Sequence, residues 1–525
     1  MQTLISLESA SELASLYIGK KVTESNITYL IQYGRIDRFT TNGSLAVSEE
    51  QIKAYYDSYH GKKEIDWKSQ LGDDLNWHLS FDAYKEAETT KHVHRLHPYK
   101  GKFIPQLVEY FLDDHTDDFK HEIYFDRGDI VLDPFCGSGT TLVQANELGM
   151  NAVGIDISRF NSLISNCKIS NYDIRYLDKI INRITEKLSE YEAELGEVAF
   201  ENELLAALYD FNTMYFPSSE YKKKVYRKEI NEDLYGKEKE NEFLPIFIDL
   251  AKKHNISIPN GSGSFLDKWY FETARKEIEF VNSLIGLITD ENTNNILKII
   301  LSRTIRSCRA TTHSDLATLI EPVYTTYYCT KHYKICKPLF SILKWWKTYS
   351  KDTIKRLTEF NNLRTNTEQI CFNDDSTQID IASSIINHGG SLADAYLKNK
   401  IKGIFSSPPY VGLINYHEQH AYAYELFDFE RNDNKEIGSM LSGSGKEAQR
   451  RYVEGIVNVL LNSKKYLAER YEVFLVANDK FNLYPQIAEL SGMQIVDEFK
   501  RPVLNRTEKD KRAYSETIFR MKEKC

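Results

Sequence analysis

The sequence contains no run of about 18 apolar residues, the length that a membrane-spanning helix requires. Its N-terminus, MQTLISLESASELASLY, also lacks the basic head and long apolar centre of a secretory signal peptide. Only seven cysteines are spread over 525 residues, and this sparse, odd-numbered set is not typical of a disulfide framework. We therefore expect a cytoplasmic protein, with no membrane partner, whose thiols are free or bound to metal.

The sequence also lacks an excess of positive charge. Its 67 Lys and Arg residues against 76 Asp and Glu residues give a net charge of −9. This balance excludes the broad positive field of a nonspecific nucleic-acid-binding protein, but it leaves room for a local basic groove. Basic side chains cluster in residues 222–228, 331–337 and 500–512, although solvated helix faces and loops produce such runs at least as often.

The sequence does contain enough apolar residues for several hydrophobic cores. Hydrophobic residues make up 42% of the chain, which is several times longer than a typical domain of about 150 residues. In residues 1–90, apolar residues at helical spacing predict two helices with a tight connection. Thr23 or Ser25 caps the second helix, and Gly34 ends it. This N-terminal helical module is compatible with a DNA-binding helix-turn-helix and with a purely structural helical pair.

From Asp129 the pattern changes to DIVLDPF, CGSG, TTLVQANELGM and NAVGIDIS, which is a strand, a glycine-rich turn, a helix and a second strand. This βαβ order is typical of a parallel sheet. Charged helical sequence follows to about residue 368, and strand-like segments return at residue 369. We therefore predict an α/β fold in which residues 91–170 and 369–525 form one doubly wound sheet, interrupted by a mainly helical insertion, residues 171–368.

The turn in LDPFCGSGTT is predicted to bind a nucleotide-like cofactor. Gly137 and Gly139 allow close approach of the backbone, and the following helix presents free N–H groups. Asp156 ends the next strand, where a carboxylate accepts hydrogen bonds from ribose hydroxyls in doubly wound folds. Leu142 stands where a dinucleotide fingerprint has its third glycine, which disfavours NAD.

A second motif, SSPPY, covers residues 406–410 and follows the apolar strand KGIF. Its two prolines fix a stiff turn that holds a polar side chain, a carbonyl and an aromatic ring at the carboxyl end of a strand. Such a turn is suited to binding a planar amine. As an isolated short motif it is often only a loop, but its presence beside DPFCGSG in one predicted sheet favours the functional interpretation.

Together these motifs resemble those of the amino-methylating DNA methyltransferases, which use S-adenosylmethionine to methylate an exocyclic amine of cytosine or adenine. The resemblance covers residues 92–170 and 369–522, and it rests on HPYKGKFIPQ (97–106), DPFCGSG (133–139), GIDIS (154–158), NDDS (373–376) and SSPPY (406–410). The order of the motifs is similar to the family's alpha-type arrangement. It implies a Rossmann-like methyltransferase sheet whose insertion is the target-recognition domain.

The resemblance also implies the residues of the site. The implied cofactor-binding residues are His97, Tyr99, Gly101, Lys102, Phe103, Asp133, Pro134, Phe135, Gly137, Gly139, Thr140, Thr141, Asp156 and Asp375. The implied catalytic residues are Ser407, Pro408, Pro409 and Tyr410. Asp374 stands where the family usually has glycine, so that Asp374 and Asp375 are both candidates for binding the adenine of the cofactor.

The chemistry explains why these residue types are needed. An aromatic amine is a poor nucleophile, so acceptors must bind its hydrogens and turn its lone pair towards the methyl donor. The Ser407 hydroxyl and the Pro408 carbonyl are the expected acceptors, and Tyr410 is expected to stack on a base flipped out of the duplex. Within this family, Ser at the first catalytic position is similar to the N4-cytosine type, whereas adenine enzymes usually carry Asp or Asn there.

The sequence thus predicts a site-specific N4-cytosine methyltransferase acting on double-stranded DNA, with a cognate restriction endonuclease as a further expected partner. An N6-adenine DNA methyltransferase, an RNA methyltransferase and a DNA-binding regulator with an inactive methyltransferase fold remain the alternatives. A cluster in the insertion, Cys308, Cys329, His332 and Cys336, has ligand types that suit tetrahedral zinc. Its spacing differs from the common paired knuckles, so we expect no metal and keep these four residues as the alternative.

Overall fold

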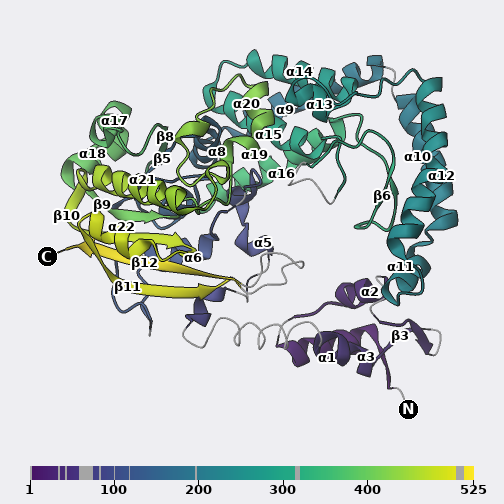
Figure 1. Cartoon of the computed structure of the whole chain (residues 1–525), viewed down its shortest axis with the longest axis horizontal. Helices are drawn as coiled ribbons and strands as arrows, with labels where there is room; N and C mark the ends of the chain where they lie inside the picture. Colours follow the sequence, from purple (N-terminus) through teal and green to yellow (C-terminus); the bar gives the residue numbers. More distant parts are fainter. Residues whose placement is uncertain are drawn as a thin grey trace. The chain divides into compact units, whose positions relative to one another are not determined.

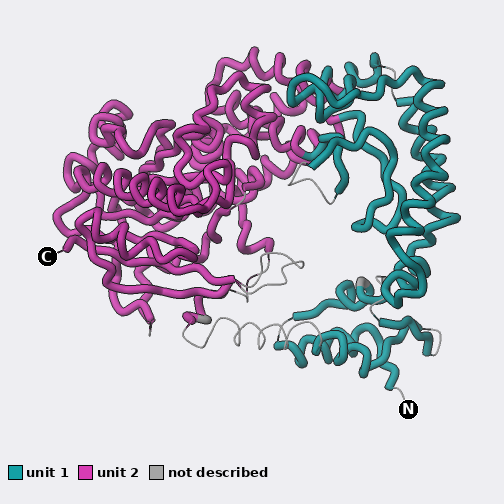
Figure 2. Tube along the Cα trace, in the orientation of Figure 1, with its two compact units in different colours: residues 1–73, 190–276, 307–341 teal, residues 74–189, 277–306, 342–525 magenta. Residues whose placement is uncertain are grey.

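The computed structural model describes residues 3–524 except 20, 33–35, 42–43, 58–74, 82–83, 85, 100, 118, 196–197, 314–319 and 504–513. The chain forms two compact units (Figure 2). Unit 1 comprises residues 1–73, 190–276 and 307–341, and unit 2 comprises residues 74–189, 277–306 and 342–525. Each unit contains part of the predicted insertion, whose role in target recognition stays a prediction.

Unit 2 is built on a seven-stranded sheet with the order β11-β12-β10-β9-β4-β5-β8 (Figure 1). The strands are β4 (Ile130–Asp133), β5 (Asn151–Asp156), β8 (Gln369–Asn373), β9 (Ile401–Ser406), β10 (Leu467–Ala477), β11 (Met493–Pro502) and β12 (Ser515–Glu523). The strands from β8 to β10 run parallel, and β12 runs antiparallel to both of its neighbours. Because β5 and β9 lie on opposite sides of β4, the sheet has a switch point between β4 and β9.

The pairing of β5 with β8 confirms that one sheet is interrupted by an insertion. Ala152 lies opposite Gln369, and Asp156 lies opposite Asn373. The chain leaves the sheet after β5 and α8 (Arg159–Ile169) and returns at β8. The predicted doubly wound fold is therefore confirmed, including the resumption of the sheet at residue 369.

Helices cover both faces of this sheet. On one face, Ile404 and Val473 belong to an apolar cluster that includes side chains of α17 (Ile381–His388), α18 (Gly390–Lys398), α21 (Lys446–Lys464) and α22 (Tyr484–Leu490). Successive side chains of a strand point to opposite faces. Accordingly Phe405 and Phe474 contact Phe111 of α6 (Pro105–Leu112), with ring centroids 5.8 and 5.1 Å apart. Next to α6 on this face lies α7 (Thr140–Glu147), which in turn contacts α8.

The insertion is mainly helical, as predicted. Its helices are α9 (Ile174–Leu195), α10 (Val198–Tyr215), α11 (Ser218–Tyr226), α12 (Glu232–Lys253), α13 (Phe265–Trp269), α14 (Glu272–Gly286), α15 (Glu291–Ser307) and α16 (Leu343–Asn361). A hairpin of β6 (Tyr327–Cys329) and β7 (Lys334–Cys336) interrupts this helical sequence. Further short helices outside the insertion are α5 (Glu86–Thr89), α19 (Tyr416–Gln419) and α20 (Ala421–Leu426).

The N-terminal part of unit 1 contains the two predicted helices, α1 (Leu7–Ile18) and α2 (Glu24–Gln32). The Thr23 hydroxyl accepts a hydrogen bond of 3.3 Å from the Asn26 N–H, which confirms Thr23 as the cap, while Gly34 lies outside the described residues. The structure adds α3 (Glu49–Tyr56) and a sheet of order β1-β3-β2, formed by β1 (Leu4–Ser6), β2 (Phe39–Thr41) and β3 (Ser44–Ser48). Strands of three to five residues show too few alternations to be recognised in a sequence.

The basic helix α11 of the insertion lies against α2 within unit 1 (Figure 1). Arg227, just beyond α11, forms an ion pair with Asp37, which follows α2. The N-terminal module and this part of the insertion therefore belong to one folded body. No helix among the described residues is both long enough and apolar enough to cross a membrane.

Candidate active site

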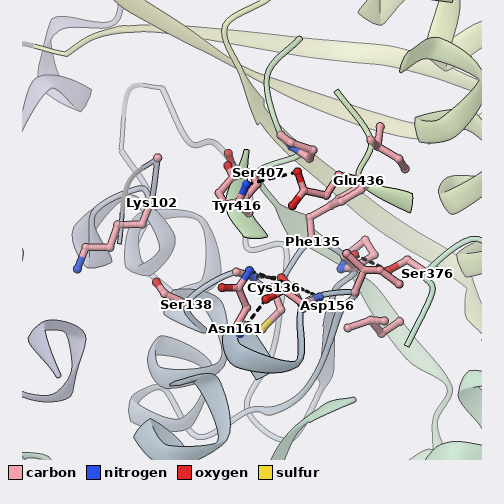
Figure 3. A pocket seen from close by; sticks show the side chains of 18 of the residues that line it. Lys102, Phe135, Cys136, Ser138, Asp156, Asn161, Ser376, Ser407, Tyr416 and Glu436 are labelled. Atoms are coloured by element: carbon pink, nitrogen blue, oxygen red, sulfur yellow. Dashed lines mark hydrogen bonds between the residues drawn. The ribbon is translucent and has the colours of Figure 1, made fainter. Parts of the chain in front are cut away.

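A pocket of about 850 Å³, including its open mouth, lies at the carboxyl ends of β4, β5 and β9, beside the switch point of the sheet (Figure 3). Parallel strands bring their carboxyl ends to one edge, where doubly wound folds bind their ligands. The predicted residues that line the pocket are Tyr99, Gly101, Lys102, Phe103, Pro134, Phe135, Gly137, Thr140, Asp156, Asp375, Ser407 and Pro409. Motifs separated by the whole insertion thus meet in one cavity.

Six predicted residues do not line this pocket: His97, Asp133, Gly139, Thr141, Pro408 and Tyr410. His97 is fully buried, and its two ring nitrogens lie within hydrogen-bond distance of the Pro98 carbonyl and the Tyr422 hydroxyl. Thr141 is also buried and donates to the Phe405 carbonyl. His97 and Thr141 are therefore buried residues that do not face the cavity.

The glycine turn requires glycine at both predicted positions. Gly137 has a φ of 52°, and a Cβ added to it would lie 2.9 Å from the Tyr99 hydroxyl oxygen. Gly139 has a φ of 72°, and its Cβ would lie 2.9 Å from Cβ of Ser165. Both residues adopt the left-handed conformation that L side chains rarely take. The turn therefore packs closely against Tyr99 and α8, where a larger side chain at either position would clash.

Asp156 is the acidic group at the centre of the turn. Its Oδ2 accepts from the Gly137 N–H at 2.8 Å, and its Oδ1 accepts from the Ser158 N–H at 2.8 Å and the Asn161 amide at 3.1 Å. Burial raises the pKa of Asp156 to about 7, and these three donors oppose the shift. A ligand that adds hydrogen-bond donors here favours the ionised carboxylate.

The pocket contains buried polar atoms that have no hydrogen-bond partner among the described residues. These atoms are Ser138 Oγ, Thr140 Oγ1 and Asn161 Oδ1, and all three residues line the cavity. A buried polar atom is costly unless it is paired. The donor and acceptor set around the turn therefore fits a polar ligand with hydroxyl and amino groups, as S-adenosylmethionine has.

Between the two aspartates after β8, the structure places Asp375 in the pocket wall and Asp374 outside it. Asp375 Oδ1 accepts from the Thr377 N–H at 2.9 Å and from the Thr377 hydroxyl at 2.7 Å. The next residue, Ser376, donates to the Pro134 carbonyl at 2.6 Å and also lines the cavity. The geometry therefore favours Asp375 over Asp374 as the ligand-facing group.

The end of β9 carries the predicted amine site. The Ser407 hydroxyl donates to the Val476 carbonyl across 3.1 Å, so its proton is directed to the backbone of β10. A hydroxyl oxygen also has two lone pairs. Ser407 therefore faces the pocket as an acceptor, which is the polarity that an amine requires.

Two tyrosines also line the cavity. The rings of Tyr99 and Tyr416 are stacked, with centroids 5.7 Å apart and an angle of 18° between the planes. Tyr410 is not among the residues that line this cavity, and its hydroxyl donates to Glu516 at 3.0 Å. The Tyr99 hydroxyl accepts from the Asn161 amide at 3.3 Å, which connects this aromatic pair to the glycine turn.

Sequence reasoning missed a group of lining residues that lie far from any motif: Lys435, Glu436, Ile437 and Val459. The Glu436 carboxylate accepts from the His417 N–H at 2.8 Å and also pairs with the imidazole of His417. His417 itself is fully buried outside the cavity. No spacing pattern in the sequence marks these residues, whereas Ser138, Ser158 and Asn161 lie within or just after recognised motifs.

Lys102, in the first motif, lines the pocket with its stem while its amine donates to the His94 carbonyl at 2.7 Å. Burial lowers the pKa of Lys102 to about 8. Figure 3 shows its side chain directed away from Asp156 and Ser407. We therefore see Lys102 as a residue that fixes the loop 97–103 rather than as a charge aimed at the reaction centre.

The cysteine and histidine cluster lies elsewhere, in unit 1. Cys329, His332 and Cys336 come together as the zinc alternative requires, but Cys308 is not part of the group, and His313 takes its place. Cys308 is a fully buried residue directly after α15. The next residue, Arg309, is only 3% exposed and is therefore not available at the surface as a DNA contact.

Comparisons of the sequence with known proteins identify DNA methyltransferases. The sequence profile of a family described as DNA methylase matches residues 12–166. The chain is 45% identical over 524 residues to the Type II methyltransferase M.MjaII of Methanocaldococcus jannaschii, covering 99% of this chain and 97% of that protein. It is also 33% identical over 103 residues to the Type II methyltransferase M.BsoBI of Geobacillus stearothermophilus, covering 19% of each chain. No solved structure shows a significant match.

Proposed function

Because this chain belongs to the DNA methylase family and is a DNA methyltransferase of the N4/N6 type, we propose that it methylates the N4 amine of cytosine at a specific site in duplex DNA. The observation that carries the proposal is the position of Ser407 in the cavity, with its proton donated to Val476 and its oxygen left to accept from an amine. A restriction-modification system with a cognate endonuclease is the setting in which we propose that it acts.

The residues around the glycine turn fit S-adenosylmethionine. Asp156 would receive the ribose hydroxyls, Asp375 would receive the adenine amino group, and the N–H groups at the start of α7 would face the polar end of the cofactor. Loop 97–103 would cover the methionine end. When bound, the cofactor supplies an electrophilic methyl group on a positively charged sulfur.

At the end of β9, Ser407 and the Pro408 carbonyl would bind the two hydrogens of the target amine. This binding withdraws the amine from conjugation with its ring and aims the lone pair into the cavity. Ser at this position, rather than Asp or Asn, supports cytosine over adenine. The ring of Tyr410, anchored through Glu516, would stack on the base after it has left the duplex.

We assign DNA binding mainly to unit 1. Helix α11 and the residues after it carry Lys222, Lys223, Lys224, Arg227 and Lys228. This basic segment lies against α2, the second helix of the N-terminal module. Exposed Lys and Arg side chains bind phosphates, and an adjacent helix with short polar residues is suited to reading base edges. The overall charge of −9 makes such a local surface necessary.

The test is to incubate the full chain with S-adenosylmethionine and duplex DNA, digest the DNA to nucleosides and identify the methylated one by mass spectrometry. We expect N4-methylcytosine. N6-methyladenine would reassign the target while leaving the family unchanged. No methylated nucleoside with any of a set of diverse duplexes, together with retained DNA binding, would favour a regulator with an inactive fold.

A further inference from the structure

The hairpin β6–β7 of unit 1 carries a cluster of two cysteines and two histidines that the methyl-transfer site does not use. Cys329 ends β6, Cys336 ends β7, and His332 lies in the loop between them. His313 reaches the group from an earlier segment of the chain. One potential ligand atom from each residue lies within 4.8 Å of all the others.

The distances between these atoms match the edges of a zinc tetrahedron. Zn–S bonds of about 2.3 Å and Zn–N bonds of about 2.0–2.1 Å at tetrahedral angles place sulfur and nitrogen about 3.6 Å apart. His332 Nδ1 lies 3.6 Å from Cys329 Sγ and 3.6 Å from Cys336 Sγ. Nδ1 of His313 lies 3.8 Å from Cys329 Sγ. Four side chains thus surround a space of the size that one ion needs.

The backbone of the hairpin holds the ligands in this arrangement. The N–H groups of His332 and Tyr333 both donate to the Cys329 carbonyl, at 3.1 and 2.7 Å. Tyr333 has a φ of 55°, a left-handed conformation that a bulky side chain rarely adopts. Strain of this kind is concentrated where a loop is clamped around a ligand. The turn directs His332 back over the two thiols.

Burial and charge also favour a metal. Cys329 and Cys336 are 3% and 8% exposed, whereas His332 is exposed, so that the thiols are shielded and one side remains open for entry of an ion. Two thiolates and two neutral imidazoles balance the charge of one divalent cation, and the thiols release their protons when it binds. A two-stranded hairpin is marginally stable by itself, and such a cross-link stabilises it.

We propose that His313, Cys329, His332 and Cys336 bind one structural Zn²⁺ ion. Two sulfur and two nitrogen ligands select zinc over the oxygen-preferring cations. All four positions are supplied by the protein, which leaves no open position for substrate, so the ion joins the hairpin to the His313 segment and takes no part in methyl transfer. The Tyr327 hydroxyl accepts from the His313 N–H at 3.2 Å and lies 2.7 Å from Nδ1 of His313, so Tyr327 holds this residue beside the hairpin.

The first experiment measures metal by mass spectrometry in the full chain, purified without chelators or added metal. We expect about one zinc ion per chain in the wild type and in Cys308→Ala, and at least a tenfold loss in Cys329→Ser and in Cys336→Ser. Cys308 is the matched control, because it is a buried cysteine of the same unit that lies outside the cluster. Zinc lost from Cys308→Ala but retained in Cys329→Ser would overturn the assignment.

A second measurement needs no variant and therefore does not depend on the folding of a mutant. X-ray absorption at the zinc edge of the wild type should show two sulfur and two nitrogen neighbours, and cobalt substitution should give the intense visible bands of a tetrahedral site. A spectrum with only oxygen and nitrogen neighbours would overturn the proposal. Zinc-free wild-type protein in which Cys329 and Cys336 resist thiol reagents until reduced would also overturn it, in favour of a disulfide.

Discussion

The Ser406 hydroxyl donates a hydrogen bond of 2.5 Å to Oδ1 of Asp133, and this bond joins the end of β9 to the end of β4. Both residues are buried, with exposed fractions of 0% and 1%. Asp133 begins the glycine motif and Ser406 begins the catalytic motif. The two halves of the site, separated by the insertion in the sequence, are therefore fixed to each other directly at the switch point of the sheet.

We predict that Ser406→Ala destabilises the protein more at alkaline than at acidic pH. Burial raises the pKa of Asp133 to about 6, and the Ser406 hydroxyl opposes this shift. Because the folded protein holds this proton more tightly than the unfolded chain, ionisation of Asp133 costs stability as the pH rises from about 4 to about 6. Loss of the donor increases this cost, by about 1–3 kcal/mol above pH 6.

The measurement is the unfolding midpoint at about pH 5 and about pH 8, on either side of this titration. Ser463→Ala is the matched control, because the Ser463 hydroxyl is equally buried but donates to the Val459 carbonyl of its own helix. We expect the control to lose the same stability at both pH values. Equal losses for Ser406→Ala at both pH values would contradict the proposed linkage.

A second prediction concerns cofactor affinity and pH. Burial raises the pKa of Asp156 to about 7, and ribose hydroxyls donate more strongly to its ionised form than to its protonated form. The dissociation constant for S-adenosylmethionine should therefore rise by up to about tenfold for each pH unit below 7 and level off above it. Calorimetry in buffers of different ionisation enthalpy should detect release of a proton on binding near neutral pH.

Asp156→Asn and Asp156→Ala provide the comparison. Both should bind the cofactor more weakly, by about 1.5–3 kcal/mol for each charge-assisted bond removed, and neither should show the pH dependence or the proton release. Asp133 also titrates in this range, but it lies outside the cavity and is unchanged in both variants. Wild-type affinity in Asp156→Ala would place the ribose site elsewhere.

The third prediction tests the basic helix. Lys223→Glu combined with Lys224→Glu in α11 should weaken DNA binding and reduce the slope of log affinity against log salt by about 0.9 for each phosphate that the protein no longer neutralises. Lys398→Glu combined with Lys400→Glu makes the same change in net charge on an exposed segment of unit 2. If both double variants lose DNA affinity equally, α11 is not the interface.

The sequence revealed the parts of the site that follow one topological rule. Gly137, Asp156 and Ser407 each stand at or just after the carboxyl end of a strand, and parallel strands gather these ends at one edge. Their meeting could therefore be predicted from the order of the strands and turns alone. Glu436 and Val459 line the same cavity from a loop and from helix α21, where their position depends on packing that leaves no periodic signal.

The cysteine cluster illustrates the same limit. Cys329, His332 and Cys336 share one hairpin, so their proximity is encoded by local spacing. His313 reaches them through the tertiary fold, and Cys308, which looks equivalent in the sequence, is buried elsewhere. The residue type of Cys308 does not show that it lies outside the cluster. Buried free cysteines are common in proteins as structural residues, so a cysteine near the hairpin in the sequence need not be a ligand.

The fourth prediction concerns Tyr410. Tyr410→Ala should reduce binding of a flipped base by about 1–3 kcal/mol, the contribution of stacking on an aromatic ring. Tyr410→Phe keeps the ring but loses the bond to Glu516, so it should retain most of this binding. A fluorescent base at the target position reports flipping directly. Normal flipping in Tyr410→Ala would transfer the stacking role to another ring, with Tyr416 as the first candidate because it lines the cavity.

The last prediction is that Ser407→Ala slows methyl transfer with little change in DNA or cofactor affinity. Its hydroxyl oxygen is needed as an acceptor mainly when the amine rehybridises, and an interaction made only in the transition state affects the rate rather than binding. Single-turnover methylation measures that rate, and fluorescence titration measures both affinities.

Ser407→Thr provides the control, because it keeps a hydroxyl that can donate to Val476 and accept from the amine. It should retain a larger share of the rate than Ser407→Ala. Since Ser407 and Asp156 lie at the ends of different strands, Ser407→Ala should leave the pH dependence of cofactor binding unchanged. Full activity in Ser407→Ala would refute the proposed amine site, and it would leave the cofactor site at Asp156 untouched, because no step of that assignment depends on Ser407.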